Sequence, residues 1–149
     1  MKFKEKILQH YKQLVQDKID AFQDMVSNLA EDARNDAKSS AGDKHETALS
    51  MMHLEQEKLS AKLQEFMGQK NILDKIDASK TAKTIAAGSL VRANGILLFM
   101  SAALPKIKIE EKSIIALSPQ SPLGSRLLGQ QAGYEFEIGG TRYAVESVE

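Results

Sequence analysis

Two acidic residues, Asp43 and Glu46, lie three positions apart in a short polar segment of the chain. Carboxylates at this spacing can help to bind a divalent cation, because Mg²⁺ is commonly held by one or two protein carboxylates together with water and phosphate oxygens. They can equally form a capping box, in which Asp43 is the helix N-cap and Glu46 reaches back to its backbone. Ser40 and Asp43 offer a similar box for a helix that starts earlier. Either role, or both, is compatible with these residues.

The acidic pair lies between two segments whose apolar residues recur at alternating spacings of three and four, which is typical of coiled-coil helices. The first stripe comprises Leu8, Lys12, Val15, Ile19, Phe22, Val26, Leu29 and Ala33, with Lys12 as a polar interruption. The second comprises Leu49, Met52, Gln56, Leu59, Leu63, Phe66, Lys70 and Leu73. Gly42 can end the first helix and Asp43 can begin the second. A turn this short makes the two helices antiparallel neighbours.

The second half of the chain has a strand-like pattern. Apolar or alternating runs occupy 85–91, 96–100, 107–117, 134–138 and 143–148, and Gly139-Gly140 between the last two predicts a tight hairpin. Ser121 as N-cap, Pro122 as first residue and Gly129 as stop predict one short helix. The sequence therefore predicts an α+β protein with an antiparallel two-helix coiled coil over 1–76 and its acidic turn at 42–46. A linker over 77–84 and a small β-sheet domain over 85–149 follow.

Composition narrows the class of protein. The 149 residues carry 20 basic and 20 acidic side chains and no cysteine. A zero net charge argues against free, sequence-specific DNA binding, and the missing cysteines exclude disulfides and Cys-based zinc sites. The longest apolar run is far shorter than the roughly 20 residues that a membrane helix needs. We expect a soluble, cytoplasmic protein.

Two separate motifs resemble the bacterial Gre transcript-cleavage factors, which act on RNA polymerase. Gly-Asp-Lys-His-Glu-Thr-Ala at 42–48 is similar to the family's Gly-Asp-Leu-Ser-Glu-Asn-Ala turn. Ser-Pro-Leu-Gly-Ser-Arg-Leu-Leu-Gly at 121–129 is similar to the family's Ser-Pro-Leu-Gly-x-x-Leu-Leu-Gly segment. The order and spacing of these blocks also fit. The resemblance implies an N-terminal coiled coil followed by a domain like that of FK506-binding proteins.

The resemblance also implies a function. A Gre-type factor binds RNA polymerase, inserts its coiled coil into the secondary channel and stimulates Mg²⁺-dependent cleavage of backtracked RNA by the polymerase's own active site. Asp43 and Glu46 would then assist the polymerase metal, and Mg²⁺ would be bound only in the complex. The protein would be an accessory factor, not an enzyme by itself.

Other residues take roles by the same resemblance. Lys38, Lys44 and His45 become candidates for contact with the nascent RNA 3′ end, although a solvated charged face or turn explains them equally well. Ser121, Pro122, Leu123 and Gly124 become candidates for polymerase binding.

The chain departs from the family pattern at Lys44, His45 and Thr47, which keeps the carboxylates but changes their surroundings. Two alternatives therefore stay open. The protein could be a Gre paralogue that occupies the channel and regulates or inhibits without cleavage. It could also be a coiled-coil interaction or chaperone-like protein with no polymerase role.

Overall fold

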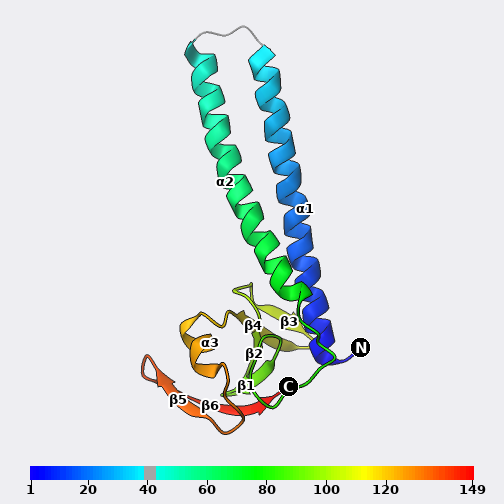
Figure 1. The fold of residues 1–149 in the computed structure, drawn as a ribbon, viewed down its shortest axis with the longest axis vertical. Helices are drawn as coiled ribbons and strands as arrows, with labels where there is room; N and C mark the ends of the chain where they lie inside the picture. Colours follow the sequence, from blue (N-terminus) through cyan, green and yellow to red (C-terminus); the bar gives the residue numbers. More distant parts are fainter. Residues whose placement is uncertain (39–42) are drawn as a thin grey trace. The chain divides into compact units, whose positions relative to one another are not determined.

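The computed structural model describes residues 1–38 and 43–149, apart from the side chains of 36–38 and 43–46. It is an α+β structure with a long helix pair and a six-stranded mixed sheet (Figure 1). In chain order the elements are α1 (Phe3–Lys38), α2 (Asp43–Asp74), β1 (Leu90–Ala93), β2 (Ile96–Met100), β3 (Ile107–Ile109), β4 (Lys112–Leu117), α3 (Pro122–Leu127), β5 (Glu135–Ile138) and β6 (Thr141–Val148).

The chain divides into two compact units. One comprises 13–70, which lie almost entirely in α1 and α2, and the other comprises 1–12 together with 71–149. Both long helices lie within the predicted 1–76 segment, but the first twelve residues and the last six of that segment belong to the unit that contains the sheet. Among the described residues, no helix combines the length and the apolar character that crossing a membrane would require.

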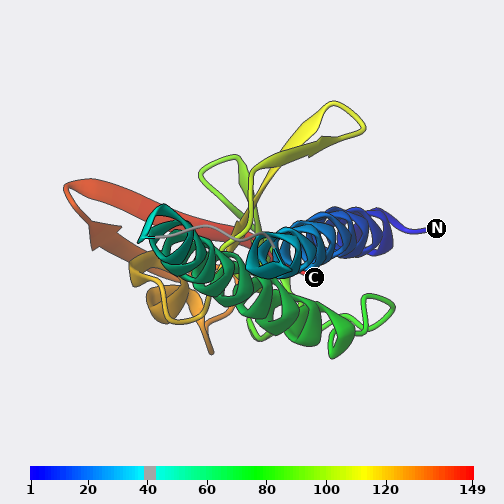
Figure 2. The ribbon, with the colours of Figure 1, turned by 90° about the horizontal axis from the view of Figure 1, so that it is seen from above.

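The helix pair is held by the predicted stripes. From Asp17 to Leu29 of α1, only Ile19, Phe22, Val26 and Leu29 are buried or partly buried, and all four belong to the first stripe. Every residue of the second stripe, from Leu49 to Leu73, is likewise buried or partly buried. Burial at every third or fourth position keeps one narrow face of each helix against the other. The two helices run side by side in both views (Figures 1 and 2).

The sheet has the order β3-β4-β2-β1-β6-β5. The β2 and β4 strands are parallel, pairing Leu97 with Ile114 and Met100 with Leu117, and every other pair is antiparallel. The predicted run at 96–100 is β2, and Gly139 and Gly140 form the β5–β6 turn with φ of +58° and +82°. Positive φ at both turn residues is what a two-residue hairpin of this type requires.

Two of the expected strands differ in the structure. The run at 107–117 is two strands, because Glu110 and Glu111 take φ of +51° and +68° and reverse the chain between β3 and β4. The run at 85–91 becomes extended only at Leu90, since Gly88 has a φ of +90° that interrupts a strand. Glutamate does not favour positive φ, so the residue types at 110 and 111 gave no indication of the turn between β3 and β4.

The sheet packs on both faces. On one face lies a core of Ile85, Val91, Ala93, Leu98, Met100, Leu117, Leu127, Phe136 and Val145, to which α3 contributes Leu127. On the other face the first turns of α1 cover β2, where the Tyr11 ring stacks on Phe99 with centroids 6.2 Å apart. Because β2 is buried on both faces, its sequence is continuously apolar instead of alternating.

Candidate functional site

The two candidate carboxylates, Asp43 and Glu46, fall at the start of the second long helix. The α1 helix ends at Lys38 and α2 begins at Asp43, so Asp43 and Glu46 both belong to the first turn of α2. The side chains of Asp43, Lys44, His45 and Glu46 lie outside the described residues, as does that of Lys38. Capping, metal binding and RNA contact by these five residues therefore stay predictions.

The helices that carry this segment are fixed to each other by an aromatic contact. Phe66 of α2 is 6% exposed and meets Phe22 of α1 edge-to-face, with ring centroids 5.1 Å apart. Lys18 and Lys62 place their ammonium groups 5.6 and 5.3 Å from the centre of the Phe66 ring. Each contact between such a partly exposed cation and an aromatic ring stabilises the folded state by at most about 1 kcal/mol. Within the unit formed by 13–70, Phe66 is thus the best-buried residue that the second stripe contributes.

Metal-ligand side chains do not gather elsewhere in the part of the chain that the structure describes. No group of three or more His, Asp and Glu residues in this part could hold a metal ion. His53, the described histidine nearest to the acidic segment, is exposed on α2.

The second motif forms a capped helix. Ser121 is the N-cap of α3, where its hydroxyl accepts from the Gly124 N–H at 3.0 Å and donates to the Ser118 carbonyl at 2.7 Å. Pro122 is the first helical residue, as predicted, and is exposed. Leu123 is partly buried against the core of the sheet. Three of the four candidate polymerase-binding residues therefore hold this helix in place, and Pro122 is the most accessible of them.

Gly124 is required by a close approach of the backbone. A Cβ atom at this position would lie 2.0 Å from the Ser118 carbonyl oxygen and 2.8 Å from the Ser121 hydroxyl. Distances below 3.0 Å are not tolerated without movement of the backbone. The motif glycine therefore has a structural reason that is independent of any partner.

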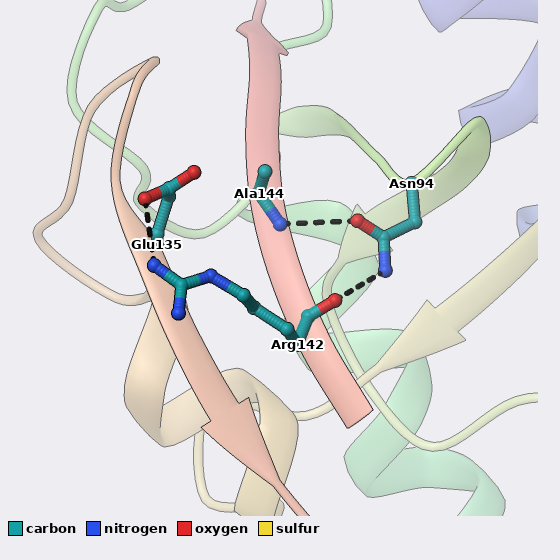
Figure 3. Close-up of polar contacts among 4 residues, drawn as sticks. All are labelled: Asn94, Glu135, Arg142 and Ala144. Carbon is teal, nitrogen blue, oxygen red and sulfur yellow. Dashed lines mark hydrogen bonds and ion pairs between the residues drawn. The ribbon is translucent and has the colours of Figure 1, made fainter. Parts of the chain in front are cut away.

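Asn94 continues the sheet with its side chain (Figure 3). Its amide donates to the Arg142 carbonyl at 2.9 Å and accepts from the Ala144 N–H at 3.0 Å. The side chain thereby takes the place of a strand partner for β6, beyond the last β1 pair of Ala93 with Val145. Arg142 extends toward β5 and pairs with Glu135 at 3.0 Å. These contacts satisfy backbone groups that the end of β1 would otherwise leave unpaired.

The start of α1 contains buried residues that the sequence pattern did not single out. Tyr11 is fully buried and donates its hydroxyl hydrogen to the Pro105 carbonyl at 2.8 Å. Burial raises the pKa of Tyr11 to about 12. Lys4 is also buried, and its ammonium donates to the backbone oxygens of Lys80 at 2.8 Å and Glu149 at 3.2 Å. The spacing of Phe3, Ile7 and Tyr11, four residues apart, marks this second apolar face and could have revealed it.

Two exposed carboxylates have lowered pKa values. The hydroxyl and backbone N–H of Ser79 donate to Asp77 and hold the pKa of that carboxyl below its usual range. At the strained β3–β4 turn, Lys6 donates a hydrogen bond to Glu110 and lowers the pKa of the Glu110 carboxyl. Both effects occur at the surface, so they report local contacts and not a catalytic environment.

Comparison with known proteins gives no assignment. No family model matches the chain, and no curated protein is significantly similar to it in sequence.

Proposed function

We propose that the protein is a Gre-type elongation factor that binds RNA polymerase through the secondary channel and stimulates cleavage of backtracked RNA. The observation that carries the proposal is the position of Asp43 and Glu46 in the first turn of α2, at the junction of two long helices held by narrow seams. A helix of the length of α2, with 32 residues, extends about 48 Å. That length suits a segment that carries two carboxylates into a deep channel.

The second motif adds independent support. The segment from Ser121 to Gly129 is similar to the Ser-Pro-Leu-Gly-x-x-Leu-Leu-Gly segment of Gre factors, and here it forms a capped helix against a six-stranded sheet. A domain like that of FK506-binding proteins is the finer fold that we propose for residues 85–149. The polymerase would be contacted through the exposed part of this motif, at Pro122.

Asp43 and Glu46 would hold a Mg²⁺ ion shared with the polymerase. Two carboxylates fit this role, because Mg²⁺ keeps several waters and takes few protein ligands. A second metal at such a site stabilises the attacking and leaving oxygens of an in-line displacement. The factor itself needs only to bind, to reach and to present its carboxylates, so the chemistry belongs to the polymerase. Lys38, Lys44 and His45 would lie beside the RNA 3′ end.

The test is transcript cleavage in stalled, backtracked elongation complexes made with RNA polymerase from the source organism. Wild type is compared with the double variant Asp43→Asn/Glu46→Gln, and polymerase binding is measured for each. The matched control is Asp17→Asn/Asp20→Asn, which neutralises two exposed carboxylates at the same spacing on α1. We expect cleavage to be lost only with the Asp43/Glu46 variant, while all three proteins bind.

Two results would contradict the proposal in different ways. If the wild type binds the polymerase but does not stimulate cleavage, a channel-binding regulator is favoured. The departures from the family pattern at Lys44, His45 and Thr47 would then explain the missing cleavage. If the wild type does not bind the polymerase, the Gre proposal is wrong. The protein would then be a coiled-coil interaction protein in which Asp43 and Glu46 only cap a helix.

A further inference from the structure

A cavity of about 480 Å³ lies within the unit formed by 1–12 and 71–149. Its walls come from the first turn of α1, the end of α2, the segment that follows it and the turn before β1. Cavities of about 300–1,000 Å³ are the usual size for small-molecule sites. Part of the lining is apolar, including Ile76 and Pro119.

The charged lining of this cavity is mainly cationic. Three lysines, Lys4, Lys75 and Lys80, line it together with a single carboxylate, Asp77. Asp77 already accepts two hydrogen bonds from Ser79, whereas Lys75 and Lys80 are exposed. The lining therefore favours a negatively charged ligand over a neutral or cationic one.

Lys4 distinguishes the cavity from an ordinary basic surface. It is 8% exposed, although lysine is almost never buried without a partner for its charge. Its ammonium has three hydrogens to donate, and the oxygens of Lys80 and Glu149 accept two of them. Among the described residues no side-chain carboxylate lies within ion-pair distance of Lys4. Two of the three ammonium hydrogens are thus accepted by main-chain oxygens, and the third remains for a ligand.

We propose that this cavity binds a small organic anion, whose carboxylate or phosphate group is held by Lys4 between Lys75 and Lys80 and whose apolar part packs on Ile76 and Pro119. An anion would accept the third hydrogen of the Lys4 ammonium, and hydrogen bonds between charged groups contribute more than those between neutral ones. This inference goes beyond the polymerase role and does not depend on it.

A proton should accompany the ligand at alkaline pH. Burial lowers the pKa of Lys4, while the charges of Glu149 and Asp77 oppose that shift. Lys75 and Lys80 also line the cavity and add positive charge beside the ammonium. A bound anion favours the charged form of Lys4, so binding should take up protons at a pH near the lowered pKa.

The experiment titrates the full chain with benzoate and with phenyl phosphate and follows the backbone amides by NMR. Benzyl alcohol and benzylamine serve as neutral and cationic probes of similar size. We expect saturable shifts at residues 80–89 with at least one of the two anions and none with benzylamine. The preferred anion then identifies the ligand group as carboxylate or phosphate.

Variants decide whether Lys4 is responsible. Lys4→Met keeps the length of the side chain and removes its charge, and we expect it to weaken binding about tenfold or more. Lys106→Met, an exposed lysine outside this cavity, is the matched control and should leave binding unchanged. If Lys4→Met does not fold, the double variant Lys75→Met/Lys80→Met decides, because both side chains are exposed.

Calorimetry in two buffers of different ionisation enthalpy adds a readout of proton uptake, which we expect for wild type and not for Lys4→Met. The proposal is wrong if neither anion gives saturable shifts or if benzyl alcohol binds as tightly as the anions. It is also wrong if the Lys4 variant, or the double variant in its place, binds like wild type.

Discussion

Replacing Gly124 with alanine tests the account of the Ser121 motif most directly. Helix propensity alone favours the change, because alanine is about 1 kcal/mol better than glycine inside a helix. The structure predicts the opposite sign. The new Cβ would lie 2.0 Å from the Ser118 carbonyl oxygen and 2.8 Å from the Ser121 hydroxyl, so the capping contacts must separate.

The size of the effect follows from these contacts. Loss of an N-cap costs about 1 kcal/mol, and forcing an extra carbon into a packed site costs about 1–3 kcal/mol. After the gain of about 1 kcal/mol from propensity, Gly124→Ala should lower the free energy of unfolding by about 1–3 kcal/mol. The matched control is Gly68→Ala, since a Cβ at this α2 position would meet nothing within 4 Å. It should stabilise its helix by up to about 1 kcal/mol.

Urea denaturation can follow the two sites separately. All three tyrosines of the chain, Tyr11, Tyr134 and Tyr143, lie in the unit that contains Gly124, so tyrosine fluorescence reports on that unit. Circular dichroism reports mainly on the long helices, where Gly68 lies. A neutral or stabilising effect of Gly124→Ala in the fluorescence transition would refute the steric argument. A loss of polymerase binding by Gly124→Ala would then have to come from a direct contact.

Two further predictions concern the unit that contains the sheet. Folding raises the pKa of Tyr11 from 10.0 to about 12, so its contribution to stability is complete below pH 10 and is lost as the pH rises to about 12. The free energy of unfolding should fall by up to about 2.7 kcal/mol, at 1.36 kcal/mol per pKa unit. Alkaline unfolding curves of wild type and Tyr11→Phe check this. If the free energy of unfolding depended on pH equally in both proteins, the prediction would be contradicted. Glu111 has a φ of +68° in the β3–β4 turn, so Glu111→Gly should raise the free energy of unfolding by about 1 kcal/mol. Its exposed pair with Lys108 contributes little. Urea denaturation measures this change. The control is Ser113→Gly in the neighbouring strand, which should lower the free energy of unfolding. A similar decrease for both variants would contradict the reasoning.

The helix pair could be predicted from the sequence because its information is local and repeated. Spacings of three and four place one residue per turn on the same face, and the stripe residues from Val15 to Ala33 and from Leu49 to Leu73 are all buried or partly buried. Ser121-Pro122 and Gly139-Gly140 were equally informative, because a cap, a fixed φ and two positive φ values depend on the residue types themselves. The acidic pair was also identified from the sequence, and its chemistry awaits the cleavage assay.

Only the tertiary structure decided the rest, because those features depend on residues far apart in the chain. Glu110 and Glu111 reverse the chain against their own preference, and the pairing of β3 with β4 on either side accompanies this turn. Asn94 acts as a strand partner only because β6, some 48 residues later, lies beside it. The sequence pattern predicts that the start of α1 continues the coiled coil. In the structure Tyr11 instead stacks on Phe99, and the Lys4 ammonium donates hydrogen bonds to the main-chain oxygens of Lys80 and Glu149. Periodicity states which face of a helix is buried, whereas the partner of that face is set by packing across the whole unit.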